Sequence, residues 1–351
     1  MSRKPRLILS KQALAANYQR LSSFSGPAEC AASIKANAYG VGIDFAAPVL
    51  WEAGCRTFFV AYLDEAIALR RLVPDAVIYV FHGLTEHELE IASASHIRPV
   101  INTLGDALDP ALAALKPALH VDTGMRRLGI PQYQHDQLIE AVSQCQPSLL
   151  MSHLASADEP ERPDSEQQRA QFEMIRSNLG TLCPPGSLAN TAGILLGAPY
   201  HYDLVRPGIG LYGGSPNPCD PQGFEAVVTW YAQVIELQQV RAGDTIGYGS
   251  SYVAPHHLSI ATIGVGYADG YLRALSGRGE VVIEGQRCPI VGRVSMDLIT
   301  VDVSTIKDVR EGAWVEMMGP AVSLDTVAQK ANTIGYECLT RLGDRLERVI
   351  V

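Results

Sequence analysis

Eight short, largely apolar runs separated by amphipathic segments most constrain how this chain can fold. Strands that are apolar throughout and alternate with helices pair in parallel, with both faces of the sheet covered. The intervening segments at 64–72, 85–95 and 164–179 have the pattern of helices. The runs are CAASIKA (30–36), TFFVAY (57–62), AVIYVF (76–81), IRPVIN (97–102), ALHVDT (118–123), SLLMSHL (148–154), GSLANT (186–191) and YDLVRPG (202–208).

Eight such units predict an α/β fold whose first part is a (β/α)8 TIM-type barrel. The fourth and seventh runs are the weakest of the eight, and an open doubly wound sheet is the alternative architecture. After about residue 225 the sequence becomes β-branched with closely spaced glycine turns, and we expect one helix near 325–332. We therefore expect a barrel domain at 1–224 and a mainly-β domain at 225–351.

Composition excludes several classes of protein. The 351 residues carry a net charge of −9, which argues against a nucleic-acid partner and against an anionic membrane surface. No apolar run approaches the roughly 18 residues that a membrane helix needs, and we see no signal peptide. Seven cysteines without CxxC or CxxH spacing predict reduced thiols in the cytoplasm and no metal site.

Polar side chains recur where the predicted strands end, which is where barrel enzymes place their reacting groups. Each alone has a structural explanation, such as a surface ion pair or a hydrogen-bonded core histidine. Together they indicate one site at one rim of the barrel. In chain order they are Lys35, Asp122, Arg127, His153, Asn190, Thr191 and Arg206, followed by Gly208 and Gly210.

The residue types at this rim limit the chemistry. No GxSxG, HExxH or P-loop motif is present, and no glycosidase-like pair of carboxylates occurs at the strand ends. Backbone N–H groups near Gly208, with Thr191 and Tyr39, can surround a phosphate. A lysine beside a phosphate site favours pyridoxal phosphate. A phosphosugar aldolase that uses a lysine without a cofactor remains the alternative on residue types alone.

Eight motifs stand out along the sequence. They are SIKANAYGVG (33–42), VAYLDEA (60–66), VDTGMRRLG (121–129), SHLASADE (152–159), LVRPGIGLYG (204–213), IGYGSSY (246–252), GVGYADG (264–270) and GRVSMD (292–297). In these motifs and in their order the chain resembles the alanine racemase family, two-domain pyridoxal-phosphate enzymes in which a barrel precedes a β domain. The resemblance extends over nearly the whole sequence.

The resemblance implies roles for individual residues. Lys35 would hold pyridoxal phosphate as a Schiff base and act as one catalytic base, and Tyr248 would be the opposite base. Arg206 would face the pyridine nitrogen with His153 behind it. The residues implied to bind the cofactor are Lys35, Tyr39, Arg127, His153, Asn190, Thr191, Arg206, Gly208 and Ile209.

The resemblance also implies a homodimer with shared active sites. Tyr248 would reach the cofactor of the other subunit, and Met296, Asp297 and Tyr267 would line the substrate pocket from that subunit, together with Arg127. The implied reaction interconverts L-alanine and D-alanine, for peptidoglycan synthesis or for alanine catabolism.

The chemistry of racemisation suits these residue types. A proton must leave one face of Cα and return on the other, so two bases on opposite sides are required. Free lysine and tyrosine titrate near ~10.4 and ~10, so both need a lowered pKa to act at neutral pH. An arginine at the pyridine nitrogen keeps its own proton, which weakens the cofactor as an electron sink and suppresses side reactions.

Two positions depart from the family pattern. Many relatives have a carbamylated lysine that orients the arginine of the DTGM motif, whereas this chain has His120 there. Arg127 is then positioned by an anion or by His120, or His120 only hydrogen-bonds within the barrel. Many relatives have a tyrosine near the C-terminus where an ungapped reading places Asp344.

Three other functions remain possible at this point. A racemase of broader specificity, for example for serine, shares the same residues. An amino-acid decarboxylase would favour a carboxylate at the position of Arg206. A non-catalytic pyridoxal-phosphate carrier usually comprises the barrel alone.

Overall fold

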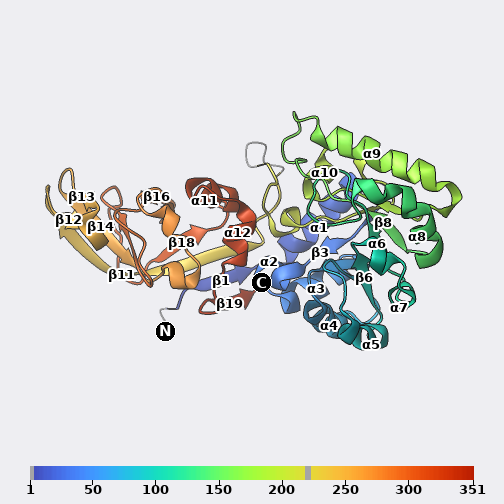
Figure 1. The fold of residues 1–351 in the computed structure, drawn as a ribbon. Helices are drawn as coiled ribbons and strands as arrows, with labels where there is room; N and C mark the ends of the chain where they lie inside the picture. Colours follow the sequence, from blue (N-terminus) through green and yellow to red (C-terminus); the bar gives the residue numbers. More distant parts are fainter. Residues whose placement is uncertain (1–3, 218–222) are drawn as a thin grey trace. The chain divides into compact units, whose positions relative to one another are not determined.

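The computed structural model describes residues 4–217 and 223–351 (Figure 1). The chain forms two compact units. We call Ala15–Ala38 with Gly42–Leu211 the barrel unit, and Met1–Leu14 with Tyr39–Val41 and Tyr212–Val351 the β unit.

The barrel unit is built on short parallel strands, one within each of the eight predicted runs. β3 to β9 form one sheet in chain order, and β10 pairs with β2, which is separated from β3 by a single residue. Backbone hydrogen bonds from Asp203 N to Gly186 O (3.0 Å) and from Arg206 N to Ala189 O (2.8 Å) connect β10 with β9 and its exit. The predicted barrel is thus confirmed, including its weakest runs. The strands are β2 (Glu29–Cys30), β3 (Ala32–Ser33), β4 (Thr57–Val60), β5 (Val77–Val80), β6 (Ile97–Ile101), β7 (Ala118–His120), β8 (Leu149–Met151), β9 (Gly186–Ser187) and β10 (Leu204–Val205).

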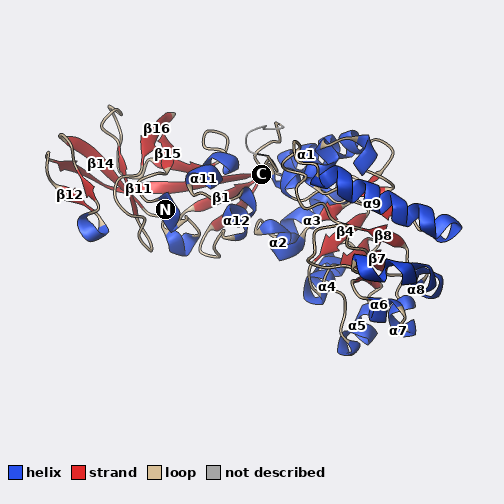
Figure 2. Cartoon of the chain, turned by 45° about the horizontal axis from the view of Figure 1, so that its top comes forward, coloured by secondary structure: helices blue, strands red, loops and turns tan. Residues whose placement is uncertain are grey.

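Helices follow the strands and cover the outside of the sheet (Figure 2). The three helices predicted from sequence are present as α4, as η1 with α5, and as α9. α9 has Asp164 and Glu166 in its first turn, which favours the helix dipole, and Gly180 ends it at a φ of 52°. The α-helices are α1 (Lys11–Ser25), α2 (Lys35–Tyr39), α3 (Ile43–Glu52), α4 (Leu63–Leu72), α5 (Leu89–Ala94), α6 (Leu104–Ala107), α7 (Pro110–Ala113), α8 (Leu138–Cys145), α9 (Asp164–Leu179) and α10 (Thr191–Leu195).

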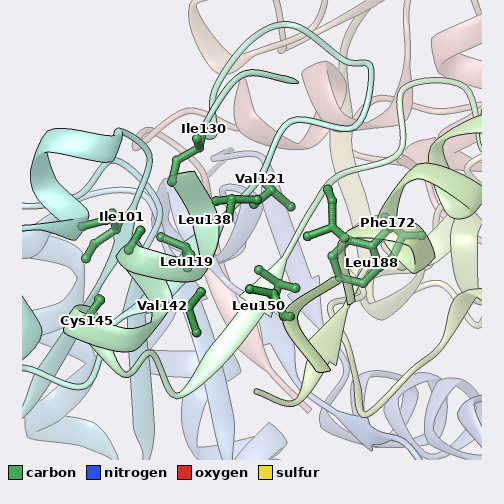
Figure 3. Packing of buried hydrophobic residues seen from close by; sticks show 14 of the residues in the cluster. Ile101, Leu119, Val121, Ile130, Leu138, Val142, Cys145, Leu150, Phe172 and Leu188 are labelled. Atoms are coloured by element: carbon green, nitrogen blue, oxygen red, sulfur yellow. The ribbon is translucent and has the colours of Figure 1, made fainter. Parts of the chain in front are cut away.

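Buried apolar side chains hold these helices against the barrel strands. Val142 of α8 and Phe172 of α9 pack in one cluster with Leu119, Leu150 and Leu188 (Figure 3). Burial of such side chains stabilises the folded state by about 1.5–3 kcal/mol each. This packing fixes the strand ends, and with them the polar residues that follow.

The β unit contains an antiparallel-rich sheet centred on the 13-residue strand β11 (Val228–Val240), which pairs with β1, β14 and β18. β1 (Arg6–Leu9), at a position where the sequence predicted no strand, also pairs in parallel with β19. α11 (Leu324–Lys330) confirms the helix expected near 325–332. The remaining elements are β12 (Thr245–Ile246), β13 (Tyr252–Val253), β14 (Leu258–Ile263), β15 (Glu280–Ile283), β16 (Gln286–Pro289), β17 (Ile299–Asp302), β18 (Trp314–Met318), α12 (Gly335–Thr340) and β19 (Glu347–Ile350).

Candidate active site

Lys35 lies two residues after the end of β3 and is only partly exposed. Burial lowers the pKa of its ammonium group, and the positive charge of Arg127 lowers that pKa further, whereas Glu65 opposes both effects. The Nζ atom lies 5.5 Å from the ring centre of Phe81, which follows β5. A lowered pKa increases the neutral, nucleophilic fraction of the amine.

α2 is not a regular right-handed helix: its backbone after Lys35 is left-handed over four consecutive residues, Ala36 to Tyr39, with φ between 53° and 56°. Left-handed helical geometry costs an L-residue about 1–2 kcal/mol, so other contacts must hold it. Glu65 Oε1 accepts a hydrogen bond from Ala36 N (2.6 Å), and Asn37 Oδ1 accepts one from Ile43 N (2.8 Å). Strained backbone of this kind concentrates at functional sites.

Arg206 is buried at the exit of β10 with 2% of its surface exposed. Its guanidinium donates to Ser187 Oγ, to Ser152 O at 2.6 Å and to Leu188 O at 3.4 Å. These acceptors are neutral, and no carboxylate of residues 4–217 or 223–351 forms an ion pair with Arg206. Burial lowers the pKa of Arg206 to about 9, so the side chain remains a cation at neutral pH.

Two histidines accompany these cations. Burial lowers the pKa of His153 well below its usual range, and the charges of Arg206, Arg127 and Lys35 act in the same direction. Burial, reinforced by Arg206, lowers the pKa of His120 to about 3. Both imidazoles are therefore neutral at pH 7.

The hydrogen bonds of His120 identify its tautomer. His120 Nδ1 lies 2.8 Å from Asn102 Oδ1. Asn102 Nδ2 donates to Phe81 O at 3.0 Å and to Val100 O at 3.1 Å. Asn102 Oδ1 must then be the acceptor, so His120 Nδ1 carries the proton and Nε2 does not. These contacts support a hydrogen-bonding role for His120 within the barrel.

Thr191, at the start of α10, meets the loop after Arg206. Its Oγ1 accepts hydrogen bonds from Gly208 N (2.9 Å) and Gly210 N (3.4 Å). A hydroxyl that accepts two bonds still has its own proton to donate. Ile209 begins the next 3-10 turn. Asn190 Oδ1 accepts from Gly193 N (2.9 Å) and so caps α10.

Arg127 is exposed and lines a groove of about 520 Å³ with Asp122, Leu128 and Tyr133. The loop that carries Arg127 is held by hydrogen bonds of the Asp122 and Gln168 side chains. Asp122 accepts from Gly124 N and Arg126 N, and the preceding strand exit is held by Gln168 of α9. Gln168 Nε2 donates to Thr123 Oγ1 (3.2 Å) and to His153 O (2.9 Å).

The other candidate residues belong to the β unit. Tyr39 is buried, its ring is stacked on Tyr212 with 4.7 Å between centres, and burial raises its pKa. Tyr248 lies in a turn whose Gly247 and Gly249 have φ of 75° and 70°. The Tyr248 side chain is 71% exposed.

Tyr267, Met296 and Asp297 lie on two adjacent turns of the β unit. Tyr267 N donates to Ser295 O and Ala268 N donates to Met296 O, both at 3.0 Å. Tyr267 and Met296 are 43% and 53% exposed. Asp297 Oδ1 accepts a hydrogen bond from Arg345 at 2.7 Å.

Sequence reasoning overlooked several residues that shape the site, namely Glu65, Asn102, Gln168 and Arg345. Asn102 ends a predicted strand and Glu65 lies within the VAYLDEA motif, so position alone could have marked both. Gln168 and Arg345 act through contacts distant in sequence and carry no local signal.

The described part of the chain has neither a metal-binding cluster nor a membrane-spanning helix. Among its residues, no group of three or more His, Cys, Asp or Glu side chains is arranged to hold a metal ion. No helix there is long and apolar enough to cross a membrane. Its six cysteines are free thiols, and Cys219 lies outside the described residues.

Two family descriptions match the chain. "Alanine racemase, N-terminal domain" matches residues 9–216 and "Alanine racemase, C-terminal domain" matches residues 227–350. Alanine racemase of Methylobacterium nodulans is 46% identical over 98% of this chain and 95% of its own length. That of Rhodospirillum rubrum is 41% identical over 97% and 94%, respectively.

Solved structures agree with these matches. Alanine racemase from Bartonella henselae with covalently bound pyridoxal phosphate superimposes with a TM-score of 0.93 at 37% identity, covering 99% of both chains. Biosynthetic alanine racemase from Pseudomonas aeruginosa superimposes with a TM-score of 0.93 at 32% identity, covering 100% of both chains. Sequence and fold together establish that the chain belongs to the alanine racemase family.

Proposed function

We propose that this protein interconverts L-alanine and D-alanine by a two-base mechanism with pyridoxal phosphate as its cofactor. The observation that carries the proposal is that a partly buried lysine and a buried arginine both follow strands of the barrel. Lys35 has a lowered pKa, and Arg206 is held only by neutral hydroxyl and carbonyl groups.

The donor groups of the barrel unit fit pyridoxal phosphate. The Lys35 amine suits the aldehyde carbon of the cofactor. The Thr191 hydroxyl proton and the N–H of Ile209 suit its phosphate, beside Gly208, whose own N–H holds Thr191 Oγ1 in place. Arg206 would face the ring nitrogen, supported by His153. We assign Arg127 to the ring hydroxyl and the substrate carboxylate, and Tyr39 and Asn190 to the remaining cofactor contacts.

When bound, pyridoxal phosphate supplies an electron sink that acidifies the Cα–H bond of the amino acid. Lys35 Nζ holds or moves the proton on one face of Cα, and Tyr248 Oη does so on the other. Arg206 keeps its own proton because its pKa of about 9 lies above neutral pH, so it would donate a hydrogen bond to the ring nitrogen without protonating it. A ring nitrogen that stays unprotonated would make the cofactor a weaker electron sink, which favours return of the proton to Cα over side reactions.

We further propose that the active protein is a homodimer. Lys35 and the other cofactor residues lie within 1–224, and residues 225–351 would supply the partner subunit's Tyr248, Tyr267, Met296 and Asp297. The 71% exposure of Tyr248 in the single chain supports this arrangement, because a catalytic phenol requires a site that excludes water. We place the enzyme in the cytoplasm, where D-alanine would serve peptidoglycan synthesis or alanine would be catabolised.

Circular dichroism of alanine solutions tests the function. We expect the holoenzyme to bring L-alanine and D-alanine to the same racemic end point. Lys35→Ala should abolish this activity and the long-wavelength absorbance of lysine-bound cofactor, since no other amine replaces Nζ. The exposed Lys307→Ala variant is the control and should retain both. The same assay with L-serine measures the breadth of specificity. An unaltered holoenzyme that leaves an L-alanine solution optically active would contradict the proposal.

A further inference from the structure

Arg345 joins two turns of the β unit through ion pairs. Its Nε lies 3.0 Å from Asp269 Oδ1, and its Nη1 lies 2.7 Å from Asp297 Oδ1. The Asp269 side chain is only 1% exposed, whereas those of Asp297 and Arg345 are half-exposed. One guanidinium therefore spans a buried carboxylate and a surface carboxylate, a geometry that its planar fork of donors permits.

The buried carboxylate belongs to the turn that carries Tyr267. Asp269 Oδ2 accepts a hydrogen bond from Gly266 N (2.9 Å) and closes the turn. Its backbone oxygen accepts from Gly343 N (3.0 Å), which brings the segment that precedes Arg345 against the same turn. Asp269 thus ties the 266–270 turn to the C-terminal segment.

The surface carboxylate belongs to the turn that carries Met296. The two turns are already joined by the backbone bonds from Tyr267 N to Ser295 O and from Ala268 N to Met296 O. A Cβ atom at Gly266 would lie 2.3 Å from Met296 O, and one at Gly270 would lie 2.2 Å from Arg341 O. The turns and the C-terminal segment are therefore in direct backbone contact, with no room for a side chain between them.

Charge explains why an arginine is needed at this junction. Burial raises the pKa of Asp269 and the negative charge of Asp297 raises it further, whereas the Gly266 N–H and the charge of Arg345 lower it. Without a cation between them, the two carboxylates would repel one another across the junction. Tyr267 and Met296 are partly exposed, so the backbone of their turns, rather than packing of their side chains, determines where they lie.

We propose that Arg345 is a positioning residue that clamps the Tyr267 and Met296 turns in the geometry used by the substrate pocket. The inference rests on the proposed racemase function, in which these two side chains line that pocket. Arg345 itself touches neither the substrate nor the cofactor in this account. It acts through Asp269 and Asp297.

Steady-state kinetics of the Arg345→Gln holoenzyme test the clamp. We expect KM for L-alanine to rise by about tenfold while kcat changes less than about threefold, because misplaced lining residues weaken substrate binding more than the chemical step. The cofactor absorbance should be unchanged, since Lys35 and Arg206 lie in the barrel unit. The matched control is Arg341→Gln, which removes an exposed arginine paired with Glu337 and should leave KM unaltered.

Arg345→Lys covers the case in which Arg345→Gln does not fold. It keeps a positive charge beside the buried Asp269, but a single ammonium lacks the planar fork of donors that spans Asp269 and Asp297, so we expect it to raise KM as well. Asp297→Asn removes the surface arm of the clamp. Because Asp297 is itself assigned to the substrate pocket, its coupling to Arg345 is the decisive measurement: in a double variant with the Arg345 substitution that folds, the two effects should be less than multiplicative, because both break one interaction.

Each remaining outcome has a defined meaning. An unchanged KM in a folded Arg345→Gln, Arg345→Lys or Asp297→Asn enzyme that still racemises alanine overturns the clamp alone, and so does independent multiplication of the two effects. Loss of kcat and of cofactor absorbance at constant KM indicates general structural damage and also overturns it. An unaltered holoenzyme that fails to racemise alanine overturns the proposed function, and the clamp falls with it.

Discussion

At the scale of single residues, the titratable groups of the barrel rim include two that are held by neutral partners. Arg206 is bound by hydroxyl and carbonyl oxygens, and His120 is bound by the amide oxygen of Asn102. Neutral partners leave the cationic charge uncompensated, so it acts on nearby titratable groups. Burial is the main cause of the lowered pKa values of Lys35, His120 and His153; the charge of Arg206 lowers the pKa of the two histidines further, and that of Arg127 lowers the pKa of Lys35 further.

The neutral state of His120 gives a prediction about stability in acid. Its folded-state pKa is about 3, below the roughly 6.5 expected of an unfolded histidine. The unfolded chain therefore binds more protons between those values, and stability falls as pH drops from about 6.5 towards 3, by at most about 1.4 kcal/mol per pH unit for this group. Urea unfolding at several pH values should show a shallower decline for His120→Asn than for the unaltered protein. Parallel declines would show that His120 protonates equally in both states.

At the scale of secondary structure, the most unusual element is the left-handed turn from Ala36 to Tyr39. Lys35 therefore lies between the end of β3 and a left-handed backbone segment, which a regular right-handed helix could not replace. Glu65 stabilises its first N–H group, and the same carboxylate also accepts from Ala61 N at 2.7 Å at the start of α4. The turn and the neighbouring strand exit are thereby coupled through one side chain.

The strain in this turn can be relieved at one exposed position. Ala36 has a φ of 53° and is exposed, so Ala36→Gly removes the left-handed penalty without opening a cavity. We expect the free energy of unfolding to rise by about 0.5–1 kcal/mol, after the greater freedom of glycine in the unfolded chain is subtracted. The urea midpoint of the holoenzyme measures this change. As a control, Ala94→Gly at the end of α5 should lower the midpoint, and a lower midpoint for Ala36→Gly would mean that the turn is not strained.

The sequence predicted regular elements well where burial alone determines them. Every apolar run contains a strand of the barrel, and α9 occupies the predicted 164–179, with acidic residues in its first turn and Gly180 directly after its last residue. The turn after Lys35 could not be predicted, since alanine and tyrosine have no preference for left-handed backbone. β1 was overlooked because its pairing partners lie more than 200 residues away along the chain.

The residues of the candidate site likewise divide into those that the sequence predicted and those that it missed. Strand-end position led to Lys35, His153, Thr191 and Arg206, and the resemblance added Tyr248 and the lining residues of the β unit. Asn102, Gln168 and Arg345 were missed because their roles depend on side-chain contacts between distant segments. Long-range polar contacts of this kind leave no periodicity in a sequence.

At the scale of the whole molecule, the proposed catalytic groups are distributed over two compact units. Lys35 belongs to the barrel unit and Tyr248 to the β unit. A shared site in a two-fold dimer would combine one subunit's Lys35 with the partner subunit's Tyr248. Assembly would then be a requirement of catalysis, and dilution below the dimer dissociation constant should abolish activity.

Complementation between two inactive variants tests this central claim most directly. Lys35→Ala and Tyr248→Phe should each be inactive alone, because each lacks one base in every site. After subunit exchange in an equal mixture, half of the dimers are mixed and each mixed dimer has one intact site, so about a quarter of the unaltered activity should return. Racemisation of L-alanine followed by circular dichroism measures the recovery. No recovery, despite exchange demonstrated with differently tagged chains, would contradict an active site built from two subunits.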